Sequence, residues 1–384
     1  MLVRKLACSL PCVLLMLASS CSVNQVPNRH SELVPYQRYA LKADLWLLQA
    51  QLDSGLLPYF YLPSTEHSPD NDYLLAQMVT AERFLRLSKK QTRFEAASQA
   101  LIENLASPMA DRPLPYQKVR PTLRTLGEQA AWLRLQLLLP SNESRSKQIE
   151  KDAEALRNSF HPTLGFPSLN DQAGDGALFM QRYFTGHAAL ALLRHSEATG
   201  SGKSDETASA VLNWLDQRYP SDEKDNFHPT HAPWHAFAIA EQYRIQGASL
   251  HLDTLFSVCD ELVSLQVDRD FPGRFFNPAN PSFGRPNIVR DALSTIAIMD
   301  ALVIAVAVND HRRQKHYRKA IRLSLNNLRA HQYDYGLVGA FDQPRRAIGA
   351  LRFRYDEERI RLDGVVYGAT AFERAAELMR KGIL

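Results

Sequence analysis

Two consecutive segments in the C-terminal third of the chain differ in how their apolar residues are distributed. Residues 292–308 read ALSTIAIMDALVIAVAV and are apolar on nearly every side of a helix. Residues 312–330, RRQKHYRKAIRLSLNNLRA, place apolar residues on one face and basic residues elsewhere. A helix that is apolar all round is buried, whereas a striped helix has a wet face. Asp300 makes a buried helix a better interpretation than a membrane span. The pair therefore predicts an inner helix followed by an outer helix.

The same alternation extends along the chain from about residue 38. Short and long connections alternate, and helices that start near 72, 121, 178, 229 and 286 define a repeat of about 50–57 residues, which is typical of a repeat architecture. A β-hairpin is expected around 338–361. The predicted helices span approximately 38–54, 72–89, 91–106, 121–139, 143–158, 178–198, 204–218, 229–247, 251–267, 286–308, 312–330 and 363–381.

The first and last of these helices have no hairpin partner in the sequence. Pairing 38–54 with 363–381 would close a ring of six hairpins, so we predict an all-α fold in one domain, 38–384. This pattern resembles the (α/α)6 toroid of six-hairpin glycosidases, several polysaccharide lyases and the C-terminal domain of D-glucuronyl C5-epimerase. An open solenoid of the TPR type is the structural alternative, and it would have shorter helices and more uniform connections.

The N-terminus has the pattern of a secretory signal. Arg4 and Lys5 precede an apolar stretch, and small residues lead to Cys21. This arrangement resembles the lipobox of bacterial lipoproteins, although Ala18 stands where Leu is usual. The resemblance implies a signal peptide at 1–20, a lipidated tether at 21–37 and membrane attachment through the lipid alone. Because Ser22 rather than Asp follows, it implies the outer membrane, with the protein facing the periplasm. The alternative is an ordinary cleaved signal.

Composition excludes several other classes of protein. The chain has 45 Lys and Arg against 41 Asp and Glu, a net charge of +4 without a long basic run, so nucleic acid is not expected as a partner. The sequence lacks Walker A, GxGxxG, GxSxG and CxxC motifs, and we expect no cofactor. After removal of the signal and lipidation of Cys21, Cys259 is the one remaining cysteine. Its helical context predicts a small buried side chain, without a disulfide.

In a toroid, the long loops and the N-termini of the inner helices share one end. Helix N-termini favour anions, and these loops are rich in arginine. We therefore expect an acidic polysaccharide or oligosaccharide as the guest. The loop arginines are Arg112, Arg120, Arg274, Arg285, Arg345, Arg346, Arg352, Arg354 and Arg361.

Polar residues near the start of each inner helix are the candidates for chemistry. His231 and His235 have the i, i+4 spacing of a metal pair, but no third ligand is evident and no metal site is predicted. Trp234 could offer a flat face to a sugar or wedge between helices. The candidates for catalysis are Asp175, His231, His235, Asp291 and Asp363. The candidates for substrate binding are Arg182, Tyr183, Trp234, Arg290, Arg361 and Tyr367.

Two functions follow from these residues. The first is a carbohydrate-active protein that acts on an acidic glycan. Hydrolysis would use two of the three aspartates, while elimination or epimerisation would use a histidine or tyrosine base with an arginine at the carboxylate. The second is a non-catalytic envelope lipoprotein that binds glycan or protein. The alternative for the loop acids and arginines is a structural role, as helix N-caps and as ion pairs with one another.

Overall fold

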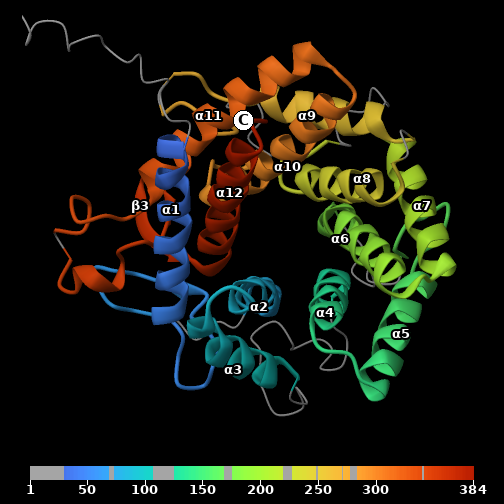
Figure 1. Cartoon of the computed structure of the whole chain (residues 1–384), viewed down its shortest axis with the longest axis horizontal. Helices are drawn as coiled ribbons and strands as arrows, with labels where there is room; N and C mark the ends of the chain where they lie inside the picture. The colour runs from blue at the N-terminus through green and yellow to red at the C-terminus, as the bar shows by residue number, and fades with distance from the viewer. Residues whose placement is uncertain are drawn as a thin grey trace, which may run out of the picture.

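The computed structural model is a closed ring of helical hairpins (Figure 1). It describes residues 30–68, 73–106, 125–167, 175–218, 227–247, 250–269, 271–276, 283–339 and 341–384. In this part of the chain, no helix is both long and apolar enough to cross a membrane. The inner helices are α2 (Leu74–Ser88), α4 (Leu126–Leu138), α6 (Asp175–Thr199), α8 (Ala232–Gln246), α10 (Ile288–Ala307) and α12 (Leu362–Arg380). The outer helices are α1 (His30–Gln49), α3 (Glu95–Ala106), α5 (Glu143–Asn158), α7 (Gly202–Asp216), α9 (Leu252–Ser264) and α11 (His311–His331).

Contacts between helices show that the ring is closed. Each inner helix packs on the next one along the chain, and α12 returns to α2. Each outer helix packs on an inner one, including α1, which lies along α12 at the opposite end of the sequence. The predicted toroid and its closure by the first and last helices are therefore confirmed, and the open solenoid is wrong. Helix α1 begins at His30, inside the segment assigned to the tether.

Burial follows the apolar patterns of the sequence. The side chains of α10 are buried on most sides, while α11 buries one face that includes Tyr317, Ile321, Leu325 and Leu328. Cys259 is buried, as predicted, and its thiol is free in the described part of the chain. Polar caps set several helix starts. The Thr125 hydroxyl accepts from the amide of Glu128, whose carboxylate accepts from the amide of Thr125, and this capping box begins α4.

A small antiparallel sheet lies beside the start of α12. The predicted hairpin is present as β2 (Arg352–Arg354) and β3 (Glu357–Arg361). A third strand that no sequence pattern indicated, β1 (Phe60–Tyr61), pairs with β3 in the order β1-β3-β2. Since β3 leads directly into α12, the sheet positions Arg361 and Asp363 at the start of this helix.

A belt of charged side chains crosses the interior of the ring, with one residue from each inner helix. Arg134 lies 2.9 Å from Glu82, and Arg194 lies 3.9 Å from Glu82 and 3.1 Å from Glu241. Arg374 lies 3.0 Å from Asp300, which explains the charge in the middle of the apolar segment 292–308. Buried charges are costly unless they are paired. We call this set the charge belt: Glu82, Arg134, Arg194, Glu241, Asp300 and Arg374.

Candidate functional site

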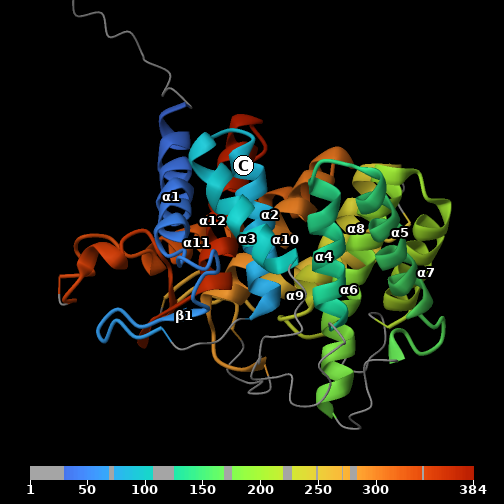
Figure 2. The ribbon, with the colours of Figure 1, turned by 90° about the horizontal axis from the view of Figure 1, so that it is seen from below.

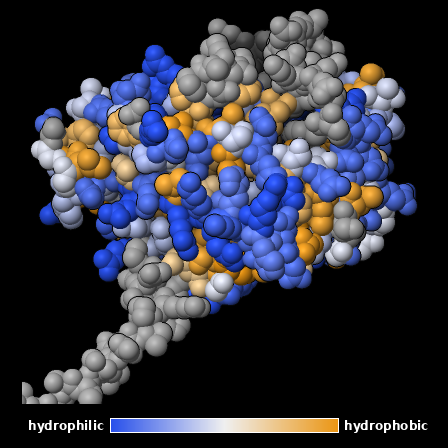
Figure 3. All heavy atoms as spheres, turned by 90° about the horizontal axis from the view of Figure 1, so that it is seen from above, coloured by the Kyte–Doolittle hydropathy of each residue, from blue (hydrophilic) through white to orange (hydrophobic). Residues whose placement is uncertain are grey.

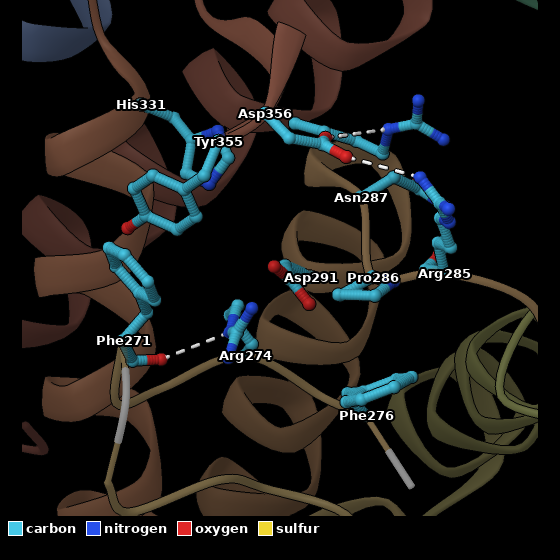
Figure 4. Close-up of a pocket in the computed structure, with 11 residues that line it drawn as sticks. Phe271, Arg274, Phe276, Arg285, Pro286, Asn287, Asp291, His331, Tyr355 and Asp356 are labelled. Atoms are coloured by element: carbon cyan, nitrogen blue, oxygen red, sulfur yellow. Dashed lines mark hydrogen bonds and ion pairs between the residues drawn. The ribbon is translucent and has the colours of Figure 1, made fainter. Parts of the chain in front are cut away.

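The N-termini of the inner helices gather at one end of the ring, which we call the loop face (lower side in Figure 2). At this face, between inner helix α10 and outer helix α11, lies a cavity of about 280 Å³ (Figure 4). We call it the Asp291 pocket. It is lined by aromatic side chains, arginines, two carboxylates and a histidine, among them Phe271, Arg274, Asp291, His331, Tyr355 and Asp356. Its volume is close to the lower end of the range of roughly 300–1,000 Å³ for ligand sites.

Asp291 forms the floor of this pocket. Its carboxylate accepts hydrogen bonds from the amide of Phe275 (3.0 Å) and the side-chain amide of Asn327 (2.9 Å). The residue is only 1% exposed. Desolvation raises the pKa of this carboxyl to about 6, although those hydrogen bonds and the charge of Arg290 oppose the shift. Asp291 therefore has the acidity of a group that can hold and release a proton near neutral pH.

The walls of the pocket are aromatic. The rings of Phe271 and Tyr355 stack with centroids 4.5 Å apart, and His331 lies 4.1 Å from Tyr355. The Tyr355 hydroxyl donates to Asn327 (2.8 Å), the residue that also binds Asp291. Desolvation lowers the pKa of His331 to about 4, so its imidazole is neutral at pH 7. The walls thus provide the apolar faces of aromatic rings and one hydrogen-bond network, which links Tyr355, Asn327 and Asp291.

Three arginines surround the opening. Arg274 donates to the carbonyl of Phe271 (3.2 Å), while Arg285 and Arg354 lie 3.2 and 3.1 Å from the carboxylate of Asp356. Arg354 also pairs with Glu357 at 2.8 Å. These three arginines therefore outnumber the two carboxylates, Asp291 and Asp356, that line the cavity itself. Because arginine binds carboxylates in a planar, two-point geometry, this rim suits an anionic guest.

A second group of predicted residues meets inside the ring. The rings of Trp234 (α8) and Tyr367 (α12) lie 6.1 Å apart, although α10 separates these helices around the ring. The Trp234 indole stacks on His187 at 3.5 Å and is 4% exposed, which supports a packing role rather than an open sugar platform. Gly186 permits this contact, since a Cβ there would lie 2.5 Å from the Trp234 backbone.

Asp363 belongs to this interior group. Arg361 contacts both of its carboxylate oxygens, with one distance of 3.0 Å, and the Tyr59 hydroxyl lies 3.5 Å away. Burial, with a smaller contribution from Asp363, raises the pKa of Tyr183 to about 12, so this tyrosine is a proton donor rather than a base at neutral pH. The geometry of the Asp363 and Arg361 pair is that of an internal ion pair, and it differs from the setting of Asp291.

The two predicted histidines form a third group. The rings of His231 and His235 are buried and lie 5.0 Å apart, and His235 contacts the carbonyl of Arg182 at 2.9 Å. Desolvation lowers the pKa of His235 to about 4 and that of His231 well below its usual value. Within the described ranges, no three His, Cys, Asp or Glu side chains are placed to share a metal ion.

The remaining candidates are Arg290 and Asp175. Arg290 is buried and donates to backbone carbonyls of the loop before α10, including that of Gly284 at 3.3 Å. Asp175 begins α6, but its side chain lies outside the described residues. Asp291 and Asp363 therefore occupy two distinct settings rather than one cleft. Sequence reasoning did not single out Asn327, Tyr355 or His331. A signal existed for Asn327, which is a polar residue on the apolar face of α11 between Leu325 and Leu328.

The fold is shared with solved carbohydrate-processing enzymes. An α-1,6-mannanase of glycoside hydrolase family 76 from Salegentibacter sp. superposes with a TM-score of 0.61 and 10% identity, over 89% of this chain and 99% of that one. Cellobiose 2-epimerase from Bacillus thermoamylovorans gives 0.63 and 10%, over 90% and 100%. A variant of the unsaturated glucuronyl hydrolase UGL, with the oligosaccharide dGlcA-Glc-Rha-Glc, gives 0.62 and 13%, over 88% and 96%. These similarities establish the (α/α)6 toroid. No family model and no curated protein sequence matches the chain.

Proposed function

We propose that this protein is a carbohydrate-active enzyme that hydrolyses an acidic glycan in the Asp291 pocket, with Asp291 as the general acid. One observation carries the proposal: a buried carboxyl with a pKa of about 6 forms the floor of a cavity whose rim is arginine-rich. Enzymes raise the pKa of a catalytic carboxyl by burial in this way. The arginines would hold the carboxylate of a uronate residue.

The chemical step needs an acid and a base. Protonated Asp291 would give its proton to the glycosidic oxygen as the bond to the anomeric carbon breaks. Asp356, which lines the same cavity and is held by Arg285 and Arg354, would accept a proton from the attacking water. Two carboxyl groups in these roles are what glycoside hydrolysis requires. His331 is neutral, and its backbone contact with Arg352 (2.9 Å) fixes it against the wall of the pocket.

The structural neighbours support a glycan as guest, but they do not provide this chain's site. One structure of the Salegentibacter mannanase holds a variant inactivated at two consecutive aspartates, in complex with α-1,6-mannotetrose. The present sequence contains no Asp-Asp pair, so a site of that form is absent. The UGL neighbour was solved with an oligosaccharide whose name begins with a uronate. The first point favours an arrangement of acids particular to this chain, and the second favours an acidic substrate.

We expect Arg274→Ala and Arg354→Ala to weaken binding of uronate oligosaccharides by about tenfold or more each, since charged hydrogen bonds contribute about 1.5–3 kcal/mol. Calorimetric titration of galacturonate and glucuronate oligomers, with neutral glucose oligomers as the comparison, measures this effect. Affinity for the acidic series should also fall between 0.1 M and 1 M salt as screening increases.

Arg380→Ala is the matched control, because this exposed arginine lies at the C-terminal end of α12, away from the loop face and the pocket. It should leave binding unchanged. Equal affinity for neutral oligomers, or no effect of either pocket substitution, would refute an anionic guest. Binding of acidic oligomers without any turnover, in wild type and variants alike, would instead identify the second candidate, a non-catalytic glycan-binding lipoprotein.

We propose that the protein is located in the cell envelope, where a lipid on Cys21 anchors it to the membrane. Radiolabelled palmitate should be incorporated into the wild-type chain and not into Cys21→Ser. The variant should leave the membrane fraction as soluble protein or accumulate with its signal uncleaved. Unchanged fractionation and mobility of Cys21→Ser would contradict the lipoprotein assignment while leaving the pocket chemistry untouched.

A further inference from the structure

Outer helix α11 carries a row of exposed basic side chains. The helix contains seven Lys and Arg and no Asp or Glu, in a chain whose total net charge is +4. Four of these residues recur at helical spacing on the side turned away from the ring, where Figure 3 shows a strongly hydrophilic surface. We call this row the α11 stripe: Arg312, Lys315, Lys319 and Arg322.

Internal ion pairing does not account for the stripe. Arg313 pairs with Asp260 (3.0 Å) and Asp310 (2.8 Å), and Arg318 donates to the carbonyl of Ile383 (2.7 Å). By contrast, none of the four stripe residues lies within ion-pair distance of a carboxylate in the described part of the chain. Like charges at i, i+3 and i+4 disfavour a helix, and so do cations in its first turn. The stripe therefore opposes the stability of the helix that carries it.

The position of the stripe relates it to the start of the chain. Helices α1 and α11 both begin at the end of the ring opposite the loop face, and the last turn of α11 reaches α1. Gln332 donates to the carbonyl of Tyr39 (2.9 Å), and the Arg329 guanidinium lies 5.9 Å from the Tyr39 ring. Cys21 lies nine positions before His30, where α1 begins. Even fully extended, nine residues span only about 30 Å.

We propose that the α11 stripe docks on the anionic phospholipid surface of the membrane that holds the lipidated Cys21. This inference rests on the lipid anchor proposed above and is independent of the chemistry in the Asp291 pocket. A tether of this length keeps the α1 end of the ring close to the bilayer, and lysine and arginine are attracted to anionic headgroups. Docked in this way, α11 lies along the membrane surface, and the loop face, with the pocket, is directed parallel to the bilayer rather than into it.

Vesicle sedimentation with the mature chain, residues 21–384 carrying Cys21→Ser, isolates the stripe from the lipid anchor. The probes are vesicles of 30% phosphatidylglycerol in phosphatidylcholine and vesicles of pure phosphatidylcholine. We expect binding to the first only, with a marked loss at high salt. The combined variant Arg312→Gln, Lys315→Gln, Lys319→Gln and Arg322→Gln should bind at least 25-fold more weakly, which corresponds to about fivefold for each of at least two side chains at the surface.

The control variant removes four exposed lysines elsewhere on the ring, as Lys89→Gln, Lys147→Gln, Lys151→Gln and Lys203→Gln. It changes the net charge equally and should bind vesicles within about twofold of wild type. Asp291→Asn should also bind vesicles normally, which separates this test from the proposed hydrolysis. An equal loss in stripe and control variants, binding to neutral vesicles, or preference for a soluble polyuronate over vesicles would each overturn the proposal. Circular dichroism melts check that both variants fold.

Discussion

Asp291→Asn is expected to abolish hydrolysis of uronide substrates almost entirely, with kcat lowered about 10²–10⁴-fold, the range for loss of a general acid. The amide cannot supply the proton that the leaving oxygen needs. Release of nitrophenol from 4-nitrophenyl glucuronides and galacturonides measures the effect. The asparagine side chain occupies the same volume, and it can keep its bonds to Phe275 and Asn327 if the Asn327 amide rotates.

The pH dependence of the same residue has a definite sign. Because the folded pKa of Asp291 is raised from 3.8 to about 6, the native state binds more protons than the unfolded state between these two values. The contribution of Asp291 to stability is therefore present below pH 3.8 and is lost as pH rises through about 6. Activity should decline over the same upper limb, as the acid ionises. Asp291→Asn should remove this loss and be no less stable than wild type at pH 7.

A loss of activity accompanied by unfolding would not test the role of Asp291, so thermal melts at pH 5 and pH 7 accompany the assay. Asp363→Asn provides the comparison, since its carboxylate is held in an internal ion pair with Arg361. This substitution should lower stability more than Asp291→Asn. Full activity of Asp291→Asn, or a rate that rises through pH 6, would refute the assignment of the acid.

Truncation after Arg361 is expected to unfold the whole ring rather than one end of it. The deletion removes α12, which contacts α1, α10 and α2 and buries large side chains such as Val365, Phe372 and Leu378. Burial of each stabilises the fold by about 1.5–3 kcal/mol. Several such losses exceed the roughly 5–15 kcal/mol that stabilises a typical domain. Circular dichroism and limited proteolysis of the truncated chain should show global loss of structure.

Removal of Gly382–Leu384 alone is the control, because it leaves α12 intact while deleting the carbonyl of Ile383 that binds Arg318. This shorter deletion should cost little and melt cooperatively. If the chain that ends at Arg361 melts near the wild-type temperature with its remaining helices protected, closure of the ring contributes much less than the packing suggests.

The sequence predicted the helices of the ring well because burial imposes a pattern on each of them. The segment 143–158 was predicted with the bounds of α5, and 312–330 differs from α11 by one residue at each end. The start of α1 was predicted less accurately, because Pro35 suggested that the tether continued through a segment that is already helical. Strand β1 was missed because two residues carry no periodicity and depend on β3, some 300 positions away.

The site was less predictable, since periodicity does not determine which neighbour a polar side chain will meet. Asp291 was a candidate from its place at the start of α10, but its pKa depends on Phe275 and Asn327, which come from other elements. Trp234 was recognised as prominent, yet the ring of His187 that covers it lies on α6, 47 positions earlier. Both outcomes depend on contacts distant in sequence, which no local pattern encodes.

The charge belt has a consequence for how such a ring can change over evolutionary time. Each inner helix contributes one charged residue, and three are acidic and three basic: Glu82, Arg134, Arg194, Glu241, Asp300 and Arg374. Loss of one hairpin would upset this balance, and loss of α2 or α12 would remove the ion-pair partner of Arg134 or of Asp300, at a cost of several kcal/mol. The apolar walls alone would tolerate a repeat added or removed. The belt thus disfavours a change in the number of hairpins during evolution, and sequence variation is better tolerated in the loops.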